Sequence, residues 1–186
     1  MKNIFLDFGT HKGEGLLEFF EKKIIDSTFE VHTFEPTPGL GTEEAINKLR
    51  NINGFPQNIH FYNKAVWIQD GTILFNNRMD HASHIINIGF NCDQEEKNYI
   101  PIEIESIDIS KFIDSLPESY IICKMDIEGS EFQVLRYLLY TRSINKINKI
   151  FVEFHPKLMN NESILTMNFL INSIKNSTNT ELALWH

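Results

Sequence analysis

Acidic side chains stand where several apolar runs of the chain end. Asp7 and Glu35 close the first two runs, and Asp126 and Glu153 close two later ones. Runs of this kind are typical of buried parallel strands, whose carboxyl ends meet at the edge of the sheet where ligands bind. The sequence therefore predicts an acidic rim around a ligand. Such a rim repels phosphates, and the chain has no G-x-x-x-x-G-K-[ST] segment to hold them.

A turn that contains glycines follows the first of these strand ends. Gly9, Gly13 and Gly15 precede Leu16, where the hydrophobic period changes from that of a strand to that of a helix. Glycine lets a ligand approach the backbone closely and tolerates the dihedral angles of a tight turn. Glu35 lies twenty residues after Gly15, where a nucleoside-binding unit places a carboxylate for the ribose hydroxyls. Glycines that only close a turn are the alternative, but they leave Glu35 and the later acids unexplained.

The acidic rim and the position of Glu35 favour a cationic nucleoside as the ligand. S-adenosylmethionine fits this description because it carries ribose hydroxyls, an ammonium and a sulfonium. A nicotinamide-dependent oxidoreductase is the main alternative. It is disfavoured by the acidic rim and by the missing third glycine of the G-x-G-x-x-G pattern.

The composition limits the class of protein. A chain of 186 residues with 42% hydrophobic residues suits a single domain, residues 1–186, with a sizeable core. Its 17 basic and 25 acidic residues give a net charge of −8, which argues against a nucleic-acid partner. Cys92 and Cys123 have neither metal-ligand nor disulfide spacing, and no apolar stretch resembles a signal peptide or a membrane span. We therefore expect a cytoplasmic protein without membrane contact.

Segments with strand and helix periods alternate along the chain. The expected strands are residues 4–7, 31–35, 59–67, 72–75, 99–104, 120–126, 150–154 and 181–185. The expected helices are residues 13–26, one that begins at Thr42, residues 108–115, and two that contain residues 132–139 and 164–174. Asp70 and Gly71 are expected to form the turn of a hairpin, and residues 76–98 a functional loop. This alternation predicts a Rossmann-like three-layer α/β/α sandwich with a mostly parallel sheet.

Several segments of the chain resemble the FkbM-type methyltransferases, a Rossmann-like class that uses S-adenosylmethionine. They are Asp7-Phe8-Gly9 with Gly13-Glu14, Phe34-Glu35-Pro36, Asn63-Lys64-Ala65-Val66 with Asp70-Gly71, the run from Lys124 to Glu131, and Val152-Glu153. These segments cover roughly residues 3 to 154, and the Lys-x-Asp-x-Glu-Gly segment is the most specific. The resemblance implies methyl transfer from S-adenosylmethionine to a small-molecule or glycan hydroxyl.

The resemblance also implies which residues bind the cofactor. They are Asp7, Gly9, Thr10, Gly13, Glu35, Pro36, Ala65, Val66 and Asp126. The turn after the first strand should line the cofactor, Glu35 should hold the ribose, and Asp126 should face the transferred methyl group. Residues 10–12 depart from the Ala-Asn pair common in the family, and the end of the chain suggests a shortened C-terminal edge. These departures leave open a third reading, a cofactor-binding or interaction module without catalysis.

A hydroxyl acceptor needs a base that removes its proton. The candidates at the strand ends are Asp126, Glu153 and His155, and His81 and His84 lie in the long loop. His155 is preferred because an imidazole titrates near neutral pH and because this residue directly follows a strand. Asp126, Glu153 and His155 could instead hold a divalent metal through oxygen and imidazole ligands. This alternative is the less favoured one, so no metal is expected.

Overall fold

The computed structural model describes residues 1–77, 83–86, 101–155 and 163–185. Its main sheet has the strand order β10-β9-β8-β1-β2-β3, and every neighbouring pair is parallel. The strands are β1 (Lys2–Phe8), β2 (Phe29–Phe34), β3 (Ile59–Tyr62), β8 (Ser119–Met125), β9 (Lys149–Val152) and β10 (Glu181–Leu184). The strand order reverses at β1, which lies between β2 and β8. Open α/β sheets bind ligands beyond the carboxyl ends of the strands at such a point.

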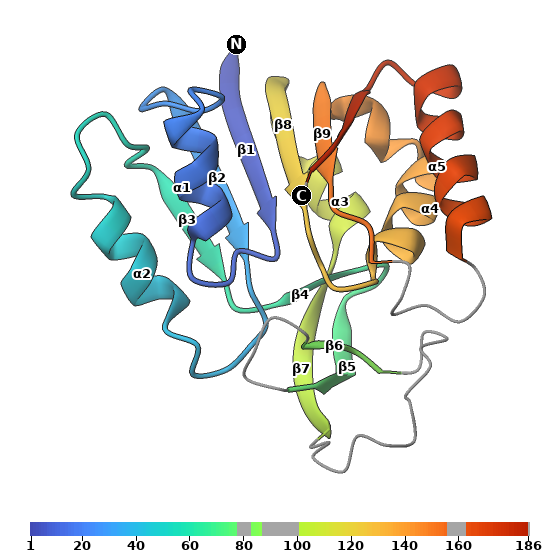
Figure 1. Cartoon of the computed structure of the whole chain (residues 1–186), viewed down its shortest axis with the longest axis horizontal. Helices are drawn as coiled ribbons and strands as arrows, with labels where there is room; N and C mark the ends of the chain where they lie inside the picture. The colour runs from blue at the N-terminus through green and yellow to red at the C-terminus, as the bar shows by residue number, and fades with distance from the viewer. Residues whose placement is uncertain (78–82, 87–100, 156–162, 186) are drawn as a thin grey trace.

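Helices cover both faces of this sheet (Figure 1). They are α1 (Glu14–Glu21), α2 (Thr42–Leu49), α3 (Ile109–Ser115), α4 (Glu131–Thr141), the short 3-10 helix η1 (Ser143–Lys146) and α5 (Ser163–Ser177). Successive side chains of β1 point to opposite faces, as the pleat of a strand requires. Ile4, Leu6 and Phe8 pack in a hydrophobic cluster with α3, α4 and α5, whereas Phe5 packs in another with α1 and α2. The predicted Rossmann-like α/β/α sandwich is therefore confirmed.

A second, smaller sheet lies below the carboxyl ends of the main strands in Figure 1. Its strands are β4 (Ala65–Trp67), β5 (Gly71–Asn76), β6 (His84–Ile85) and β7 (Pro101–Asp108), in the order β4-β7-β5-β6. β4 runs parallel to β7, whereas β5 is antiparallel to both β7 and β6. Val66, Trp67 and Phe75 belong to the same hydrophobic cluster as Phe8 of the main sheet. The two sheets therefore share a core.

The segment predicted as one strand over residues 59–67 is two strands in different sheets. The chain leaves the main sheet after Tyr62, and the Asn63 side-chain amide donates to the Glu35 carbonyl oxygen (2.8 Å) before β4 begins. The predicted hairpin is also wrong, because β7 lies between β4 and β5. Both errors have one cause: a period of two residues indicates a strand but does not indicate which strand lies beside it.

The first helix is shorter than the predicted residues 13–26. It ends at Glu21, and Lys23 adopts a left-handed conformation (φ 57°) that turns the chain away from the helix. The predicted loop over residues 76–98 is described only in part, and its described residues include β6, which pairs with β5. Among the described residues, no helix is long and apolar enough to span a bilayer.

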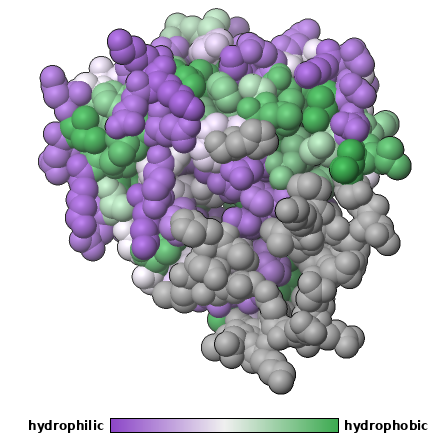
Figure 2. All heavy atoms as spheres, in the orientation of Figure 1, coloured by the Kyte–Doolittle hydropathy of each residue, from purple (hydrophilic) through white to green (hydrophobic). Residues whose placement is uncertain are grey.

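Hydrophobic side chains also reach the surface over α5 (Figure 2). Ile164, Leu165 and Phe169 are exposed there, while Leu170 and Ile174 of the same helix are buried against the core. This helix therefore carries apolar residues on its exposed side as well as on its buried side.

Candidate active site

A cleft opens where the main sheet meets the second sheet. It encloses about 650 Å³, part of which is open to solvent. Six residues predicted to bind the cofactor line it: Gly9, Glu35, Pro36, Ala65, Val66 and Asp126. Gly9 and Asp126 follow the central strands β1 and β8, Glu35 follows β2, and Ala65 begins β4. The structure thus brings these residues together, and their role in binding stays a prediction.

The turn after β1 fits tightly between the ends of the neighbouring strands. The Gly9 and Thr10 amides both donate to the Phe34 carbonyl oxygen (3.0 and 3.1 Å), and the Asp126 amide donates to the Phe8 carbonyl oxygen (3.0 Å). Gly9 has a φ of 80°, and a Cβ atom there would lie 1.7 Å from the Asp126 carbonyl oxygen. Only glycine therefore lets this turn approach the end of β8 so closely.

Glu35 is held in a fixed position at the edge of the cleft. The residue is 6% exposed, and its Oε2 accepts a hydrogen bond from the His11 amide (2.9 Å) while its Oε1 accepts one from the Thr37 amide (2.8 Å). An ionised carboxylate offers about four acceptor positions in all, so these two bonds leave acceptor capacity on both oxygens. This rigid carboxylate is suited to accept hydrogen bonds from a pair of hydroxyls.

Three residues predicted to contact the cofactor do not line the cleft, and their role in binding stays a prediction. Asp7 is fully buried, and its carboxylate lies beside the Lys124 ammonium. Thr10 is 1% exposed, and its hydroxyl donates to the Asp7 carbonyl oxygen (3.1 Å). A Cβ atom at Gly13 would lie 2.9 Å from Leu49 Cδ1, so this glycine makes room for α2 rather than for a ligand. All three residues support the turn from its buried side.

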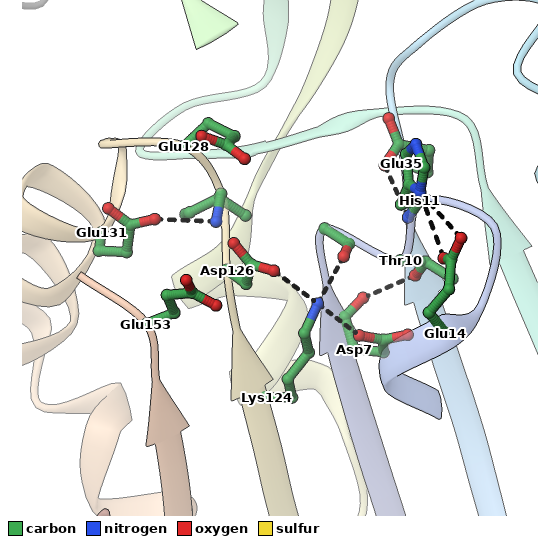
Figure 3. A network of polar contacts seen from close by, with 12 residues as sticks. Asp7, Thr10, His11, Glu14, Glu35, Lys124, Asp126, Glu128, Glu131 and Glu153 are labelled. Carbon is green, nitrogen blue, oxygen red and sulfur yellow. Dashed lines mark hydrogen bonds and ion pairs between the residues drawn. The ribbon is translucent and has the colours of Figure 1, made fainter. Parts of the chain in front are cut away.

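Lys124 joins the turn after β1 to the end of β8 (Figure 3). Its Nζ donates to the Gly9 carbonyl oxygen (2.6 Å) and lies 3.5 Å from Asp7 Oδ1 and 3.4 Å from Asp126 Oδ2. Burial acts to lower the pKa of Lys124, but the two carboxylates outweigh it and raise this pKa above its usual value. Burial raises the pKa of Asp7, while the attraction of Lys124 opposes that shift. The ammonium thus stays charged at the centre of the network.

A second cluster of charges surrounds His155, just beyond β9. Its Nδ1 lies 3.0 Å from Glu131 Oε1, and its Nε2 lies 3.7 Å from carboxylate oxygens of both Asp126 and Glu128 and 3.8 Å from Glu153 Oε1. Figure 3 shows the four carboxylates gathered near the ends of neighbouring strands. Asp126 and His155 thus lie side by side beyond the ends of two adjacent parallel strands.

These carboxylates determine the protonation of His155. Burial acts to lower the pKa of the imidazole, but Glu131, Glu128 and Asp126 outweigh it and raise the pKa of His155 to about 9. The ring therefore carries a proton at neutral pH, and an imidazolium cannot accept a second one. His155 is also absent from the residues that line the cleft. The structure thus favours a role in positioning neighbouring carboxylates over the predicted role as a base.

Glu128 is the carboxylate best placed to accept a proton within the cleft. It lines the cleft and adopts a left-handed conformation (φ 51°), which is uncommon for a residue other than glycine and recurs at active sites. Burial raises the pKa of Glu128 to about 7, and His155 opposes this shift. A base works best when its pKa lies near the working pH. Glu128 was not among the bases predicted from the sequence, although its position two residues after Asp126 was a usable signal.

The metal site considered at Asp126, Glu153 and His155 differs from the set of ligands that the structure brings together. The ligand atoms that lie within 4.8 Å of one another belong to Asp126, Glu131 and His155. Glu153 was also a predicted base, but it does not line the cleft and therefore does not face a hydroxyl acceptor bound there. A metal there has to displace the proton of the imidazolium, because only a neutral imidazole binds a metal. The arrangement therefore favours an ion-paired cluster.

The two histidines of the long loop differ in what the structure describes. His84 lies in β6 and is buried, and its neighbours Ser83 and Ile85 line the cleft. His81 lies outside the described residues. Part of the predicted functional loop therefore contributes to the wall of the cleft.

Fold and site together define a Rossmann-like α/β protein with a ligand cleft at the point where the strand order reverses. The family model of the methyltransferase FkbM domain matches residues 7–174. The chain therefore belongs to the FkbM methyltransferase family, and the resemblance seen in its sequence is confirmed.

Known proteins extend this comparison. The solved structure of methyltransferase FkbM from Methylobacillus flagellatus KT matches with a TM-score of 0.57 and 20% identity, over 93% of this chain and 37% of that chain. At this identity the likeness shows the fold alone. Two curated proteins from Leptospira interrogans, both ATP phosphoribosyltransferase regulatory subunits, are 39% identical over 61 residues, which is 32% of this chain and 18% of theirs. The chain thus spans less than a fifth of the length of these curated relatives.

Proposed function

We propose that this chain transfers a methyl group from S-adenosylmethionine to a hydroxyl of a small molecule or sugar. The observation that carries the proposal is the cleft at the carboxyl edge of the sheet, where Gly9, Glu35 and Asp126 meet in a member of the FkbM family. Family membership indicates methyl transfer, and the residues of the cleft support the choice of methyl donor. The class of acceptor rests on the family resemblance.

The charges of the cleft fit a cationic nucleoside. Among the described residues, the lining includes the carboxylates of Glu35, Asp126 and Glu128 and contains no lysine or arginine. Such a lining attracts a sulfonium and an ammonium, and it repels the pyrophosphate of a nicotinamide dinucleotide. S-adenosylmethionine is therefore favoured over NAD.

Different groups of the cleft suit different parts of S-adenosylmethionine. The Glu35 carboxylate, held by two backbone amides, would accept hydrogen bonds from the ribose hydroxyls. Ala65 and Val66 offer apolar surface for the adenine ring, and Asp126 contributes a carboxylate to the lining for the cationic end. When bound, the cofactor supplies an electrophilic methyl group. The chain supplies orientation, which in well-aligned reactions is worth roughly 7–11 kcal/mol of the barrier.

Removal of the acceptor's proton is assigned to Glu128. This carboxylate lines the cleft, and because its pKa is about 7 it can accept a proton at neutral pH. The His155 imidazolium, 3.7 Å from Glu128 Oε2, would position it through their ion pair. Glu128 therefore acts as the base and His155 as a positioning residue in this proposal.

Ligand binding provides the first test. Thermal unfolding is measured with S-adenosylmethionine, with its demethylated product, with NAD and with ATP. The first two should raise the midpoint and the last two should not, because a ligand stabilises the folded state in proportion to its affinity. Stabilisation by NAD without stabilisation by S-adenosylmethionine would favour a nicotinamide-dependent oxidoreductase over a methyltransferase.

Methyl transfer provides the second test. The chain is incubated with methyl-labelled S-adenosylmethionine and a panel of sugars and small hydroxyl compounds, with duplex DNA and lipid vesicles as further arms. Label should appear in a hydroxyl compound only, since the net charge of −8 disfavours nucleic acid. Binding of the cofactor without transfer to any member of the panel would favour a module without catalysis.

A further inference from the structure

Two histidines and a glutamate lie close together on the main sheet, away from the cleft. Glu30 and His32 lie two residues apart in β2, so their side chains share one face of the sheet, and His60 of β3 is the register partner of His32. Glu30 Oε1 lies 3.2 Å from His32 Nε2 and 3.5 Å from His60 Nε2. All three atoms lie within 4.8 Å of one another. The set lies toward the amino ends of its strands, whereas the cleft lies beyond the carboxyl ends.

The buried histidine of this set has a nitrogen without a hydrogen bond. His32 is 5% exposed, and within the described part of the chain its Nε2 lies 3.2 Å from Glu30 Oε1 without the alignment of a hydrogen bond. Its other ring nitrogen, Nδ1, lies 3.1 Å from Tyr62 Oη. A histidine that binds a metal through one nitrogen characteristically hydrogen-bonds through the other, which fixes the ring. His32 therefore has the environment of a metal ligand on both of its nitrogens.

The two distances from Glu30 Oε1 to the histidine nitrogens suit zinc. Two ligand atoms bound to one tetrahedral zinc at about 2.0–2.1 Å lie about 3.3–3.4 Å apart. The separations of Glu30 Oε1 from the two Nε2 atoms, 3.2 and 3.5 Å, are close to this spacing. Two imidazoles and one carboxylate form a ligand set that zinc proteins use, with the fourth position left to water. The His60 side chain is 44% exposed, so solvent can reach that position.

We propose that Glu30, His32 and His60 form a zinc site that joins the edge strand β3 to β2. The metal would bind Glu30 through Oε1 and both histidines through Nε2. Lys2 pairs with the other carboxylate oxygen of Glu30 (3.2 Å) and would orient it without occupying the metal position. The site is separate from the cleft and does not depend on the function proposed for it.

The competing explanation is packing alone. The His32 and His60 rings stack (centroids 4.8 Å apart, planes at 17°), and Phe112 of α3 covers His32 edge-on. Stacked imidazoles beside a carboxylate need no metal if one ring carries a proton. The two explanations differ in affinity for zinc, which can be measured.

The experiment uses the 186-residue chain without a polyhistidine tag, dialysed against a chelator and titrated with zinc chloride by calorimetry. Tyr62→Phe should weaken zinc binding by roughly 10–100-fold, the usual effect of losing an outer hydrogen bond to a ligand. His60→Ala should weaken it by more than this, because a ligand itself is lost. Cobalt should give the visible absorption of a tetrahedral site in the parent and lose it in His60→Ala.

His155→Ala is the matched control because it removes the histidine of the cluster beside the cleft. It should bind zinc at the Glu30 site with parent affinity. Circular dichroism without metal checks that each variant is folded, and His60 is exposed enough to be replaced without disturbing the core. The proposal is overturned if the metal-free parent takes up no zinc, if His60→Ala binds it like the parent, or if His155→Ala abolishes binding.

Discussion

The ion-pair network at Lys124 leads to a prediction about stability. Lys124→Met removes the ammonium and keeps the length of the side chain. The residue is 2% exposed, and its Nζ lies 3.5 Å from Asp7 Oδ1 and 3.4 Å from Asp126 Oδ2. Asp7 is fully buried, so the substitution leaves a carboxylate without its cation inside the protein. Breaking a buried pair in this way typically costs about 3–5 kcal/mol. Loss of the bond to the Gly9 carbonyl adds to this cost.

The assay is urea unfolding of the parent, Lys124→Met and the double variant Lys124→Met/Asp7→Leu. Removing both charges should recover most of the loss, because an apolar pair of similar volume is often as stable as a buried ion pair. Lys149→Met is the control, since Lys149 pairs with the exposed Glu181 and such a pair is worth about 0–1 kcal/mol. The reasoning is refuted if Lys124→Met loses no more stability than Lys149→Met.

The loss in Lys124→Met should also depend on pH. Burial raises the pKa of Asp7, and removal of Lys124 raises it further. The folded state then binds a proton in a pH range where the unfolded state does not, so stability falls as the pH rises through that range. The variant should therefore be closer to the parent near pH 4 than near pH 7.

Four further outcomes are expected. Glu35→Gln should weaken S-adenosylmethionine binding by about 1.5–3 kcal/mol in calorimetry, and unchanged affinity in a folded variant would contradict the ribose role. Gly9→Ala should lower the free energy of unfolding by more than the roughly 1–2 kcal/mol of a left-handed alanine, because its Cβ also meets the Asp126 carbonyl. Glu128→Gln should lower the transfer rate by about 10²–10⁴-fold and abolish the rise in rate near pH 7, whereas a parent-like pH profile would exclude it as the base. Since the pKa of His155 is raised to about 9, its ion pairs should stabilise the fold fully below about pH 6.5 and be lost as the pH rises to about 9, a dependence that His155→Gln should flatten in pH-resolved unfolding curves.

The sequence predicted the fold and half of the site because both depend on patterns local to the chain. Asp126 closes one predicted strand and His155 directly follows another, and parallel strands bring such ends to one edge. Glu35 was placed by its distance from the glycine turn, and it lines the cleft. The role of Asp7 could not be read in the same way. Its type and position match a ligand-facing acid, but burial beneath the turn depends on Lys124, which is distant in the chain.

Long-range pairing also explains what the sequence could not show about the strands and the base. The period of residues 59–67 is that of a strand, and nothing in it marks the change of sheet at Asn63. The pKa of His155 depends on the carboxylates of Asp126, Glu128 and Glu131 in an earlier segment of the chain, so its proton could not be placed from its position after a strand. Burial, which a local pattern does not show either, raises the pKa of Glu128 and makes it the proposed base.

The central place of β1 in the sheet has a consequence for the order in which the protein folds on the ribosome. β1 is made first, yet one of its two partners is β8, and the bond that fixes the turn after it joins Lys124 to Gly9 across 115 positions. Contacts so distant in sequence form slowly, because a long loop must close before they contribute. While β8 has not yet left the ribosome, the nascent chain therefore exposes an unpaired edge of the apolar strand β1. This edge is a target for chaperones and for aggregation. Substitutions that weaken the contact between β1 and β8 should reduce the yield of folded protein during synthesis more than they reduce the activity of molecules that have already folded.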